Sequence, residues 1–368
     1  MKSNNQNTQC YTIDFEFVPK AKKTFGRNKL DTLGQLGTKN NQSREIEIPG
    51  NGSDITDKNV MTAKAKKKLI TQKVVLALID HARKKDNEEF MKSLWNTYHC
   101  LNKVIVSDKK LHGKYCKNRI CTVCNGIRKA EMINRFLPTV QSWEDPYFVT
   151  LTAKSCYANK LYYRMRNTKR ALKKIEGRMK KRYLRGKGPK LVAIKSLECN
   201  FNPNKRWYNP HFHILVPNKE LAEILKREWL STWTGKYTSL DGQKLREVKD
   251  TERDLIEVIK YGSKILTEPN PRNKSKRNKI TRRVYIAALY NILYAMKGLR
   301  LVDTCGFKLP KEKNKSVSNT TLIEYQKLSY ESEIMDWVDK ETGETLSGYT
   351  PSLELINILN NRIDTSLQ

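Results

Sequence analysis

The sequence is poor in acidic residues and in histidine, and it lacks long apolar runs. Its 368 residues include 71 lysines and arginines against 38 aspartates and glutamates, which gives a formal net charge of +33. This excess is larger than solubility requires, so it favours a polyanionic partner, with nucleic acid as the first candidate. A basic surface that is only solvated is the alternative.

No apolar run is long enough to span a bilayer, and the first residues, MKSNNQNTQC, lack the apolar segment of a signal peptide. These absences predict a cytoplasmic protein without a membrane partner. Because thiols stay reduced in the cytoplasm, the eight cysteines are expected to be metal ligands rather than disulfides.

The order of apolar patterns predicts an α+β fold with a central antiparallel sheet flanked by helices. Strands are expected at residues 147–153, 191–199 and 211–216, and helices at 61–95, 159–185, 219–233, 252–267 and about 286–296. The predicted domains are a poorly ordered region (1–60), a helical segment with a cysteine module (61–140), the α+β domain (141–308) and an acidic, helical C-terminal extension (309–368).

Two of the five histidines, His211 and His213, stand one residue apart in the stretch HFHILV. Residues i and i+2 of a strand point to the same side, so both imidazoles share one face while Phe212, Ile214 and Val216 face a core. Paired imidazoles suit a metal ion. The alternative is two unrelated histidines, each with its own hydrogen bond.

Glu198 offers a third ligand for such an ion. It ends the preceding predicted strand, and the stretch NFNPNKRWYNP can turn the chain back into a hairpin. In that hairpin the carboxylate would lie across from the histidine pair. A surface glutamate at a strand end is the alternative.

The stretch DLIEVIKYGSKIL places a carboxylate, a phenol and two ammonium groups on one side of a helix. These groups are Glu257, Lys260, Tyr261 and Lys264. A phenol has an ordinary pKa near 10 and becomes a useful nucleophile only when cations or a metal stabilise the phenolate. An amphipathic helix with its charges in water is the alternative.

Four cysteines have the spacing C-x15-C-x4-C-x2-C: Cys100, Cys116, Cys121 and Cys124. Four thiolates with a CxxC pair suit a closed tetrahedral zinc site, which would be structural because no position stays open. His99 or His112 could replace one thiolate. Buried reduced thiols are the alternative.

Basic residues concentrate in two segments that are candidates for binding phosphates. Residues 159–190 hold fourteen lysines and arginines against one glutamate, and residues 269–283 form a basic loop. The candidate contacts are Arg170, Lys173, Lys174, Arg178, Lys260, Arg282 and Arg283. Candidates for stacking on single-stranded bases, with core packing as the alternative, are Trp207, Tyr208, Trp229 and Trp233.

The cysteine cluster is followed in order by YFVTLTA, NPHFHILV, EVIKYGSK and KGLRLVDTCGFKL. This ordered set, from about residue 100 to residue 307, resembles the replication initiators of rolling-circle plasmids, which belong to the HUH endonuclease superfamily. The long basic insert, the N-terminal region and the acidic tail have no clear counterpart in that pattern.

The resemblance implies a ferredoxin-like or RRM-like sheet and a site-specific nick in one strand of single-stranded or hairpin origin DNA. His211 and His213 would hold Mg²⁺ or Mn²⁺, with Glu198 as a weaker third match. Tyr261 would be the nucleophile that forms a 5′-phosphotyrosine and a free 3′-hydroxyl, with Lys264 supporting the phenolate. Glu257 would act as the later general base, and a host helicase and polymerase would be partners.

Two other readings remain open. A relaxase or a single-strand transposase would use the same chemistry. A zinc-containing nucleic-acid-binding protein would show no catalysis at all.

Overall fold

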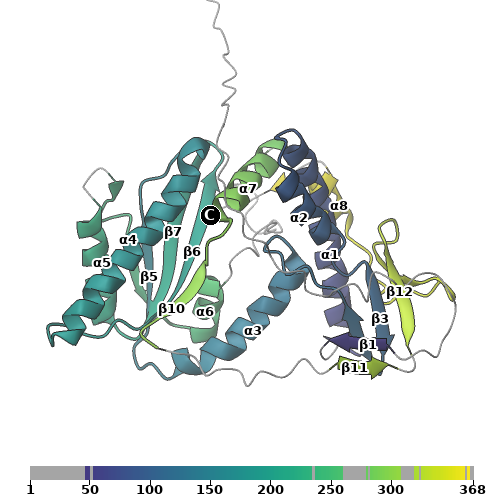
Figure 1. Ribbon diagram of the computed structural model, residues 1–368, viewed down its shortest axis with the longest axis horizontal. Coiled ribbons are helices and arrows are strands. Elements are labelled where there is room, and N and C mark those ends of the chain that lie inside the picture. Colours follow the sequence, from purple (N-terminus) through teal and green to yellow (C-terminus); the bar gives the residue numbers. More distant parts are fainter. Residues whose placement is uncertain are drawn as a thin grey trace, which may run out of the picture. The chain divides into compact units, whose positions relative to one another are not determined.

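The computed structural model of the protein describes residues 46–49, 53–233, 237–259, 279–280, 282–307, 319–322, 325–360 and 363–364 (Figure 1). The chain divides into two units, Met1–Asn40 and Asn41–Gln368, and all described residues belong to the second. The expectation of a poorly ordered region at 1–60 therefore falls mostly outside the described residues. No helix in the described ranges is both long enough and apolar enough to cross a membrane.

The central sheet contains five antiparallel strands in the order β10-β6-β7-β5-β8. The strands are β5 (Tyr147–Thr152), β6 (Ala193–Asn202), β7 (Trp207–Val216), β8 (Lys244–Glu247) and β10 (Val302–Cys305). The long β6–β7 hairpin keeps one-to-one pairing, from Ile194 opposite Leu215 to Asn202 opposite Trp207. The expected α+β class and antiparallel sheet are confirmed.

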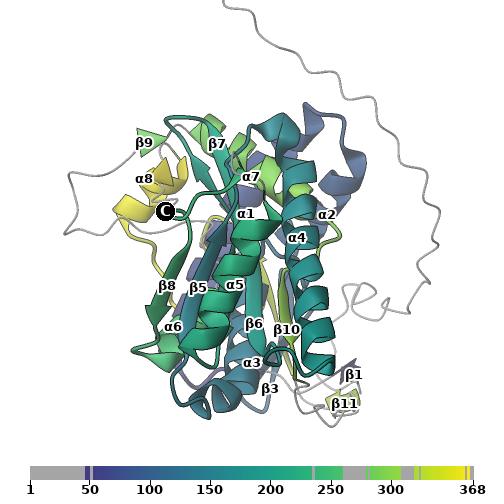
Figure 2. The same cartoon turned by 90° about the vertical axis from the view of Figure 1, so that its left-hand side faces the viewer.

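Helices cover both faces of this sheet. On one face, α4 (Ala158–Leu184), α5 (Lys219–Thr232) and α7 (Arg282–Met296) form a core with the strands. On the other face lie α3 (Thr122–Gln141) and α6 (Thr251–Ile259). Figure 1 shows α4 and α5 on one side of the strands and α3 and α6 on the other, and Figure 2 views the side covered by α4 and α5.

The two faces follow from the alternation of side chains along each strand. Phe212 and Ile214 of β7 are buried in the core with α4 and α5, as the sequence predicted. Leu215, which faces the other way, packs with residues of α3 and α6. Each such side chain contributes about 1.5–3 kcal/mol when fully buried. We call the face that carries His211 and His213 the histidine face.

A second antiparallel sheet has the order β13-β12-β3-β4-β2. Its strands are β2 (Ser53–Asp54), β3 (Lys103–Ser107), β4 (Lys110–Gly113), β12 (Gln326–Glu331) and β13 (Asp336–Asp339). Three helices come from the same two parts of the sequence as these strands: α1 (Lys58–Arg83) and α2 (Glu88–Tyr98) from the N-terminal part, and α8 (Leu353–Asn360) from the C-terminal part. The sequence treated 61–140 and 309–368 as separate parts, whereas strands from both lie in this one sheet.

The second sheet has its own core. Trp337 of β13 is fully buried there, and its indole N–H donates to the carbonyl of Leu101 at 2.6 Å. The neighbouring Asp336 carboxylate accepts hydrogen bonds from the backbone of Trp337, Ser347 and Gly348. Two short strand pairs complete the described elements: β1 (Ile46–Pro49) with β11 (Asn319–Leu322), and β9 (Lys279–Ile280) with β14 (Ile363–Asp364).

Candidate metal centres and nicking site

Strand β7 places both imidazoles on the histidine face. His211 pairs with Glu198 of β6 and with Thr152 of β5, and His213 pairs with Thr150 of β5. Paired residues of neighbouring strands project to the same face, so Glu198 stands beside both rings. The hairpin expected from the sequence therefore brings all three side chains together.

The geometry of these three side chains fits a metal ion. The two Nε2 atoms are 3.2 Å apart, and the Glu198 Oε2 lies 3.9 Å from His211 Nε2 and 3.8 Å from His213 Nε2. Two nitrogens bound to one ion at about 2.0–2.1 Å are separated by roughly 2.9–3.4 Å at octahedral or tetrahedral angles. The imidazoles match this separation, whereas the carboxylate would move inward by a few tenths of an ångström. The group could hold a metal.

Further contacts orient the imidazoles. His211 Nδ1 lies 2.9 Å from the carbonyl oxygen of Asn209, and because a carbonyl only accepts, this nitrogen carries the proton. In the neutral ring, Nε2 of His211 is then the unprotonated nitrogen that a cation needs. His213 Nδ1 lies 3.3 Å from the Thr150 hydroxyl, and its ring contacts Phe148 at 5.1 Å between centroids.

The four cysteines meet where α2, the loop after β4 and the start of α3 come together. Cys121 is the N-cap of α3, and its sulfur accepts the backbone N–H of Cys124 at 3.5 Å. The Cys116 N–H points at the Cys100 sulfur at 3.4 Å. Such N–H groups stabilise thiolates, so the backbone is arranged for charged sulfurs.

The sulfur positions fit a tetrahedral site. Cys100 Sγ lies 3.6 Å from Cys124 Sγ and 3.7 Å from Cys121 Sγ, and Cys116 Sγ lies 3.7 Å from Cys124 Sγ. Zinc–sulfur bonds of about 2.3 Å give a tetrahedron with edges of roughly 3.8 Å. The four-thiol group could therefore hold a metal. Neither His99 nor His112 belongs to it within the described part of the chain.

The environment of the cysteine group also suits a cation. Hydrogen bonds from the neighbouring thiols, and then burial, raise the pKa of the Cys100 thiol. Four thiolates this close together would repel one another, and a bound cation would offset that repulsion. The fully buried Lys68 ammonium donates to the carbonyl of Cys100 at 2.6 Å and to the side chain of Asn102 at 2.5 Å. Burial lowers the pKa of this ammonium to about 8, while negative charge on the neighbouring sulfurs favours its protonated form.

Helix α6 packs on the histidine face. Its Leu255, Val258 and Ile259 are buried against Phe148, Ile194 and Leu215. Glu257 is half-buried on this helix. Lys260, Tyr261 and Lys264 lie outside the described residues. The candidate nucleophile, Tyr261, follows the last described residue of α6 by two positions.

The sequence matches the replication protein family over residues 108–344. The chain belongs to this family. The match covers more than half of the chain, including the histidine pair, three of the four cysteines and strands β12 and β13. The resemblance to replication initiators drawn from the ordered motifs is confirmed at the level of the family.

Relatives of this replication protein are similar over parts of their length. A "Protein rep" of Staphylococcus aureus is 28% identical over 181 residues, which are 44% of this chain and 75% of that protein. A "Protein rep" of a Bacillus species and one of Bacillus amyloliquefaciens are each 25% identical over 134 residues, and the chain spans 42% and 38% of their lengths. No solved structure matches the chain significantly.

The basic candidates of the replication protein lie on different elements of the structure. Helix α4 lies on the face of the central sheet opposite the histidines, so Arg170, Lys173 and Lys174 are exposed away from the candidate metal group. Arg178 is held by an ion pair with Glu228 at 2.8 Å. Arg283 is exposed on α7, and the side chain of Arg282 lies outside the described residues.

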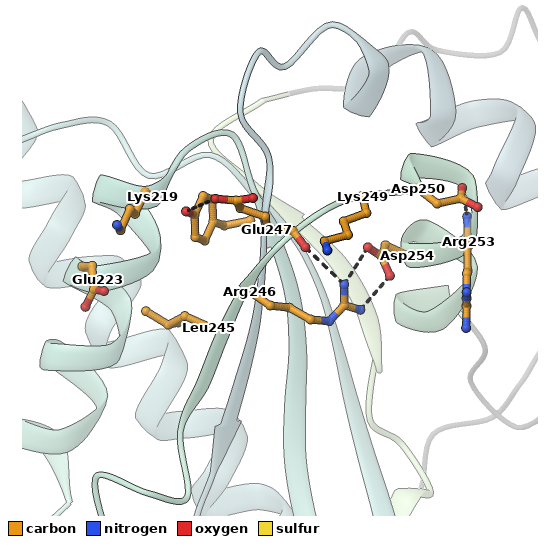
Figure 3. Close-up of a pocket in the computed structure, with 10 residues that line it drawn as sticks. Lys219, Glu223, Leu245, Arg246, Glu247, Lys249, Asp250, Arg253 and Asp254 are labelled. Atoms are coloured by element: carbon orange, nitrogen blue, oxygen red, sulfur yellow. Dashed lines mark hydrogen bonds and ion pairs between the residues drawn. The ribbon is translucent and has the colours of Figure 1, made fainter.

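Sequence reasoning missed a clamp between β8 and α6. Arg246 donates two hydrogen bonds to the Asp254 carboxylate, at 2.7 and 2.6 Å (Figure 3). Its guanidinium also lies 4.2 Å from the centre of the Phe148 ring. The clamp borders a cavity of about 720 Å³ at the edge of the sheet. Phe148 in turn contacts His213, so the clamp ties α6 to the neighbourhood of the metal group. No short motif announces such a pair.

Proposed function

We propose that this replication protein initiates rolling-circle replication of a plasmid by nicking one strand of its origin DNA. One observation carries the proposal: Glu198, His211 and His213 converge on the face of the sheet against which α6 packs. Tyr261 follows the last described residue of α6 by two positions, and the proposal requires its phenol to reach the metal group. The HUH type of fold and a nicking domain at residues 141–308 are part of this proposal.

The proposed reaction is a transesterification. The Tyr261 phenol loses its proton and its oxygen attacks the scissile phosphorus, while the bond from phosphorus to the 3′-oxygen breaks. The products are a 5′-phosphotyrosine and a 3′-hydroxyl, which takes up a proton. Lys260 and Lys264 would stabilise the phenolate, because nearby cations lower the pKa of an acid.

Glu257 would take part in the closing step. Placed four residues before Tyr261, it is one helical turn away if α6 continues. As a general base it would remove a proton from water, whose oxygen then displaces the tyrosine from the phosphate. One tyrosine with one carboxylate predicts hydrolytic release rather than transfer between two tyrosines.

The two metal groups would have different tasks. Glu198, His211 and His213 would hold Mg²⁺ or Mn²⁺, which when bound acts as a Lewis acid on the phosphate oxygens. The four cysteines would hold structural zinc, because four protein ligands leave no open position.

Origin DNA, single-stranded or in a hairpin, is the proposed substrate. The new 3′-hydroxyl would be extended by a host polymerase, with a host helicase separating the strands. Because α4 lies on the opposite face, Arg170, Lys173 and Lys174 would bind DNA away from the cut, and such phosphate contacts make affinity depend on salt.

The test is incubation of the protein with single-stranded origin DNA and Mn²⁺. Wild type should form a covalent protein–DNA adduct, and mass spectrometry should place the DNA on Tyr261. The Tyr261→Phe variant should lose the adduct and keep DNA affinity. Tyr294→Phe, which changes a 44% exposed tyrosine of α7, is the matched control and should react normally.

The outcomes also separate the alternatives. Equal behaviour of wild type and Tyr261→Phe would refute the nicking proposal and leave a binding protein without catalysis. An adduct of Glu257→Ala that is released at the normal rate would remove the role of that carboxylate.

A further inference from the structure

We propose that Trp207 and Tyr157 form a stacking site for unpaired bases of a DNA strand on the histidine face. The site itself rests on the structure alone. Its relation to the nick rests on the proposed function, because it would hold the strand at a fixed distance from the cut.

The two rings meet at the tip of the β6–β7 hairpin. Their centroids are 6.0 Å apart with an interplanar angle of 82°. Trp207 is the first residue of β7, opposite Asn202 of β6. Tyr157 precedes α4 and follows Cys156, whose backbone exchanges two hydrogen bonds with Tyr208, at 2.9 and 2.8 Å.

Strand alternation puts both rings on the histidine face. Pairing between β6 and β7 is unbroken from Trp207 to Leu215, so Trp207 projects to the same side as His211 and His213. Cys156 and Tyr208 are buried in the core of the opposite face. Tyr157, the next residue after Cys156, therefore turns towards Trp207.

The other aromatic candidates are occupied in the core. Trp229 is fully buried, and its indole donates to the carbonyl of Thr152 at 2.7 Å. Tyr208 is 4% exposed and accepts a hydrogen bond from Asn291. Trp233 packs against the same core. In contrast, Tyr157 is 58% exposed, so its ring is available to a base.

The surroundings of the pair are basic. The Lys205 ammonium lies 5.2 Å from the centre of the Trp207 ring, and Lys160 and Arg206 are exposed nearby in the sequence. The backbone N–H of Lys205 donates to the Asn202 side chain at 3.0 Å, which fixes the turn. Aromatic rings beside cations are the usual combination for binding single strands, because bases stack while ammonium groups attract phosphates.

A single aromatic residue on a surface is common and implies nothing. Here two rings touch, a cation lies over one of them, and all stand on the face of the candidate metal group. Trp207 is four residues from His211, or about 13 Å along an extended strand. That distance corresponds to about four stacked nucleotides, and to fewer if the DNA is stretched.

The test measures the affinity of the full-length protein for a labelled single-stranded oligonucleotide without added Mg²⁺ or Mn²⁺. Trp207→Ala and Tyr157→Ala should each raise Kd by about 5- to 150-fold, the usual range for loss of one stacked base. Trp207→Phe, which keeps a ring, should recover most of the affinity. Trp95→Ala removes a 39% exposed tryptophan of α2, outside the basic segments, and should bind as wild type does.

An independent arm leaves the protein unchanged and removes bases from the DNA. Abasic sites placed at successive positions of the origin strand should weaken wild-type binding most at a position within about four nucleotides of the cut. In Trp207→Ala, an abasic site at that position should weaken binding no more than one at any other position. The proposal is overturned if the double alanine variant binds within twofold of wild type, or if no abasic position stands out. A wild-type protein that binds in this way but never cleaves would refute the nicking proposal alone.

Discussion

The proposed metal at the four cysteines predicts an effect on strands that are distant from the cysteines in sequence. If the group holds a metal, removing the ion should unfold the second sheet and leave the central sheet folded. The perturbation is chelation of the purified protein, or Cys121→Ser, which removes a fully buried ligand. Cys305→Ser, in β10 of the central sheet, is the matched control.

The expected magnitude follows from the geometry. Sulfur separations of 3.6–3.7 Å match a bound tetrahedral ion, whose binding contributes about 10–16 kcal/mol in zinc-finger peptides. Whole domains are stable by only about 5–15 kcal/mol. Cys100, Cys121 and Cys124 also lie inside the core that contains Trp337. The free energy lost with the ion would therefore be as large as the whole stability of this core, and the core should unfold.

Hydrogen exchange with mass spectrometry is the assay. After chelation, amides of β3, β12 and β13 should lose protection together, although β3 and β12 are more than 200 residues apart in the chain. Amides of β5, β6 and β7 should keep theirs, and the fluorescence of buried Trp337 should shift to the red. If metal analysis finds an ion that chelation removes while β12 stays protected, the reasoning is refuted.

Other substitutions test the Arg246–Asp254 clamp, the Thr150 hydroxyl beside His213, and a buried lysine. Arg246→Met should lower the free energy of unfolding in urea by about 1.5–2 kcal/mol, the low end for charged hydrogen bonds, because the arginine is half-exposed. Asp254→Asn should lower it less, because it leaves no buried charge without a partner. Equal losses would argue that the buried Asp254 carboxylate is not the cause of the destabilisation. Thr150→Val should weaken Mn²⁺ binding about 10-fold or more by calorimetry, since it removes the hydroxyl that lies 3.3 Å from His213 Nδ1. An unchanged affinity would reject a role for this contact in orienting the ring. Burial lowers the pKa values of both Lys64 and Lys68 to about 8, so between pH 8 and about 10.5 the unfolded chain binds more protons and stability should rise with pH. Lys64→Met should make this rise smaller, with the part due to Lys68 remaining, and should add up to about 3 kcal/mol at pH 7. A rise of unchanged size would exclude Lys64 as one of its sources.

Short-range patterns predicted most of the central sheet and its polar group. Side-chain alternation in HFHILV separates the imidazoles from Phe212 and Ile214, and a turn-rich stretch returns the chain so that Glu198 meets them. Both relations involve residues within about fifteen positions, where strand geometry and chain connectivity leave few choices.

Long-range relations were not predictable in this way. The pairing of β12 with β3 places Leu328 opposite Val104, and nothing in the sequence of either strand predicts that the two strands pair. Helix α3 was missed because its first turn is formed by the cysteine motif, with Cys121 as its cap. The periodicity of α4 identified a helix with an apolar side but not the sheet face that this side covers. The basic residues of this helix lie on the face of the sheet opposite the histidines, a placement that periodicity alone does not give.

The candidate site depends on the register of the β6–β7 hairpin. A slip by one residue would turn His211 and His213 into the core and expose Phe212 and Ile214. Burial of the two apolar side chains, at about 1.5–3 kcal/mol each, therefore fixes the positions of the imidazoles without any contact between the two sets. The backbone bridge from Cys156 to Tyr208 holds the other end of the same strand, next to Trp207. The packing that makes β7 a central strand thus sets the spacing between the candidate metal group and the stacking site.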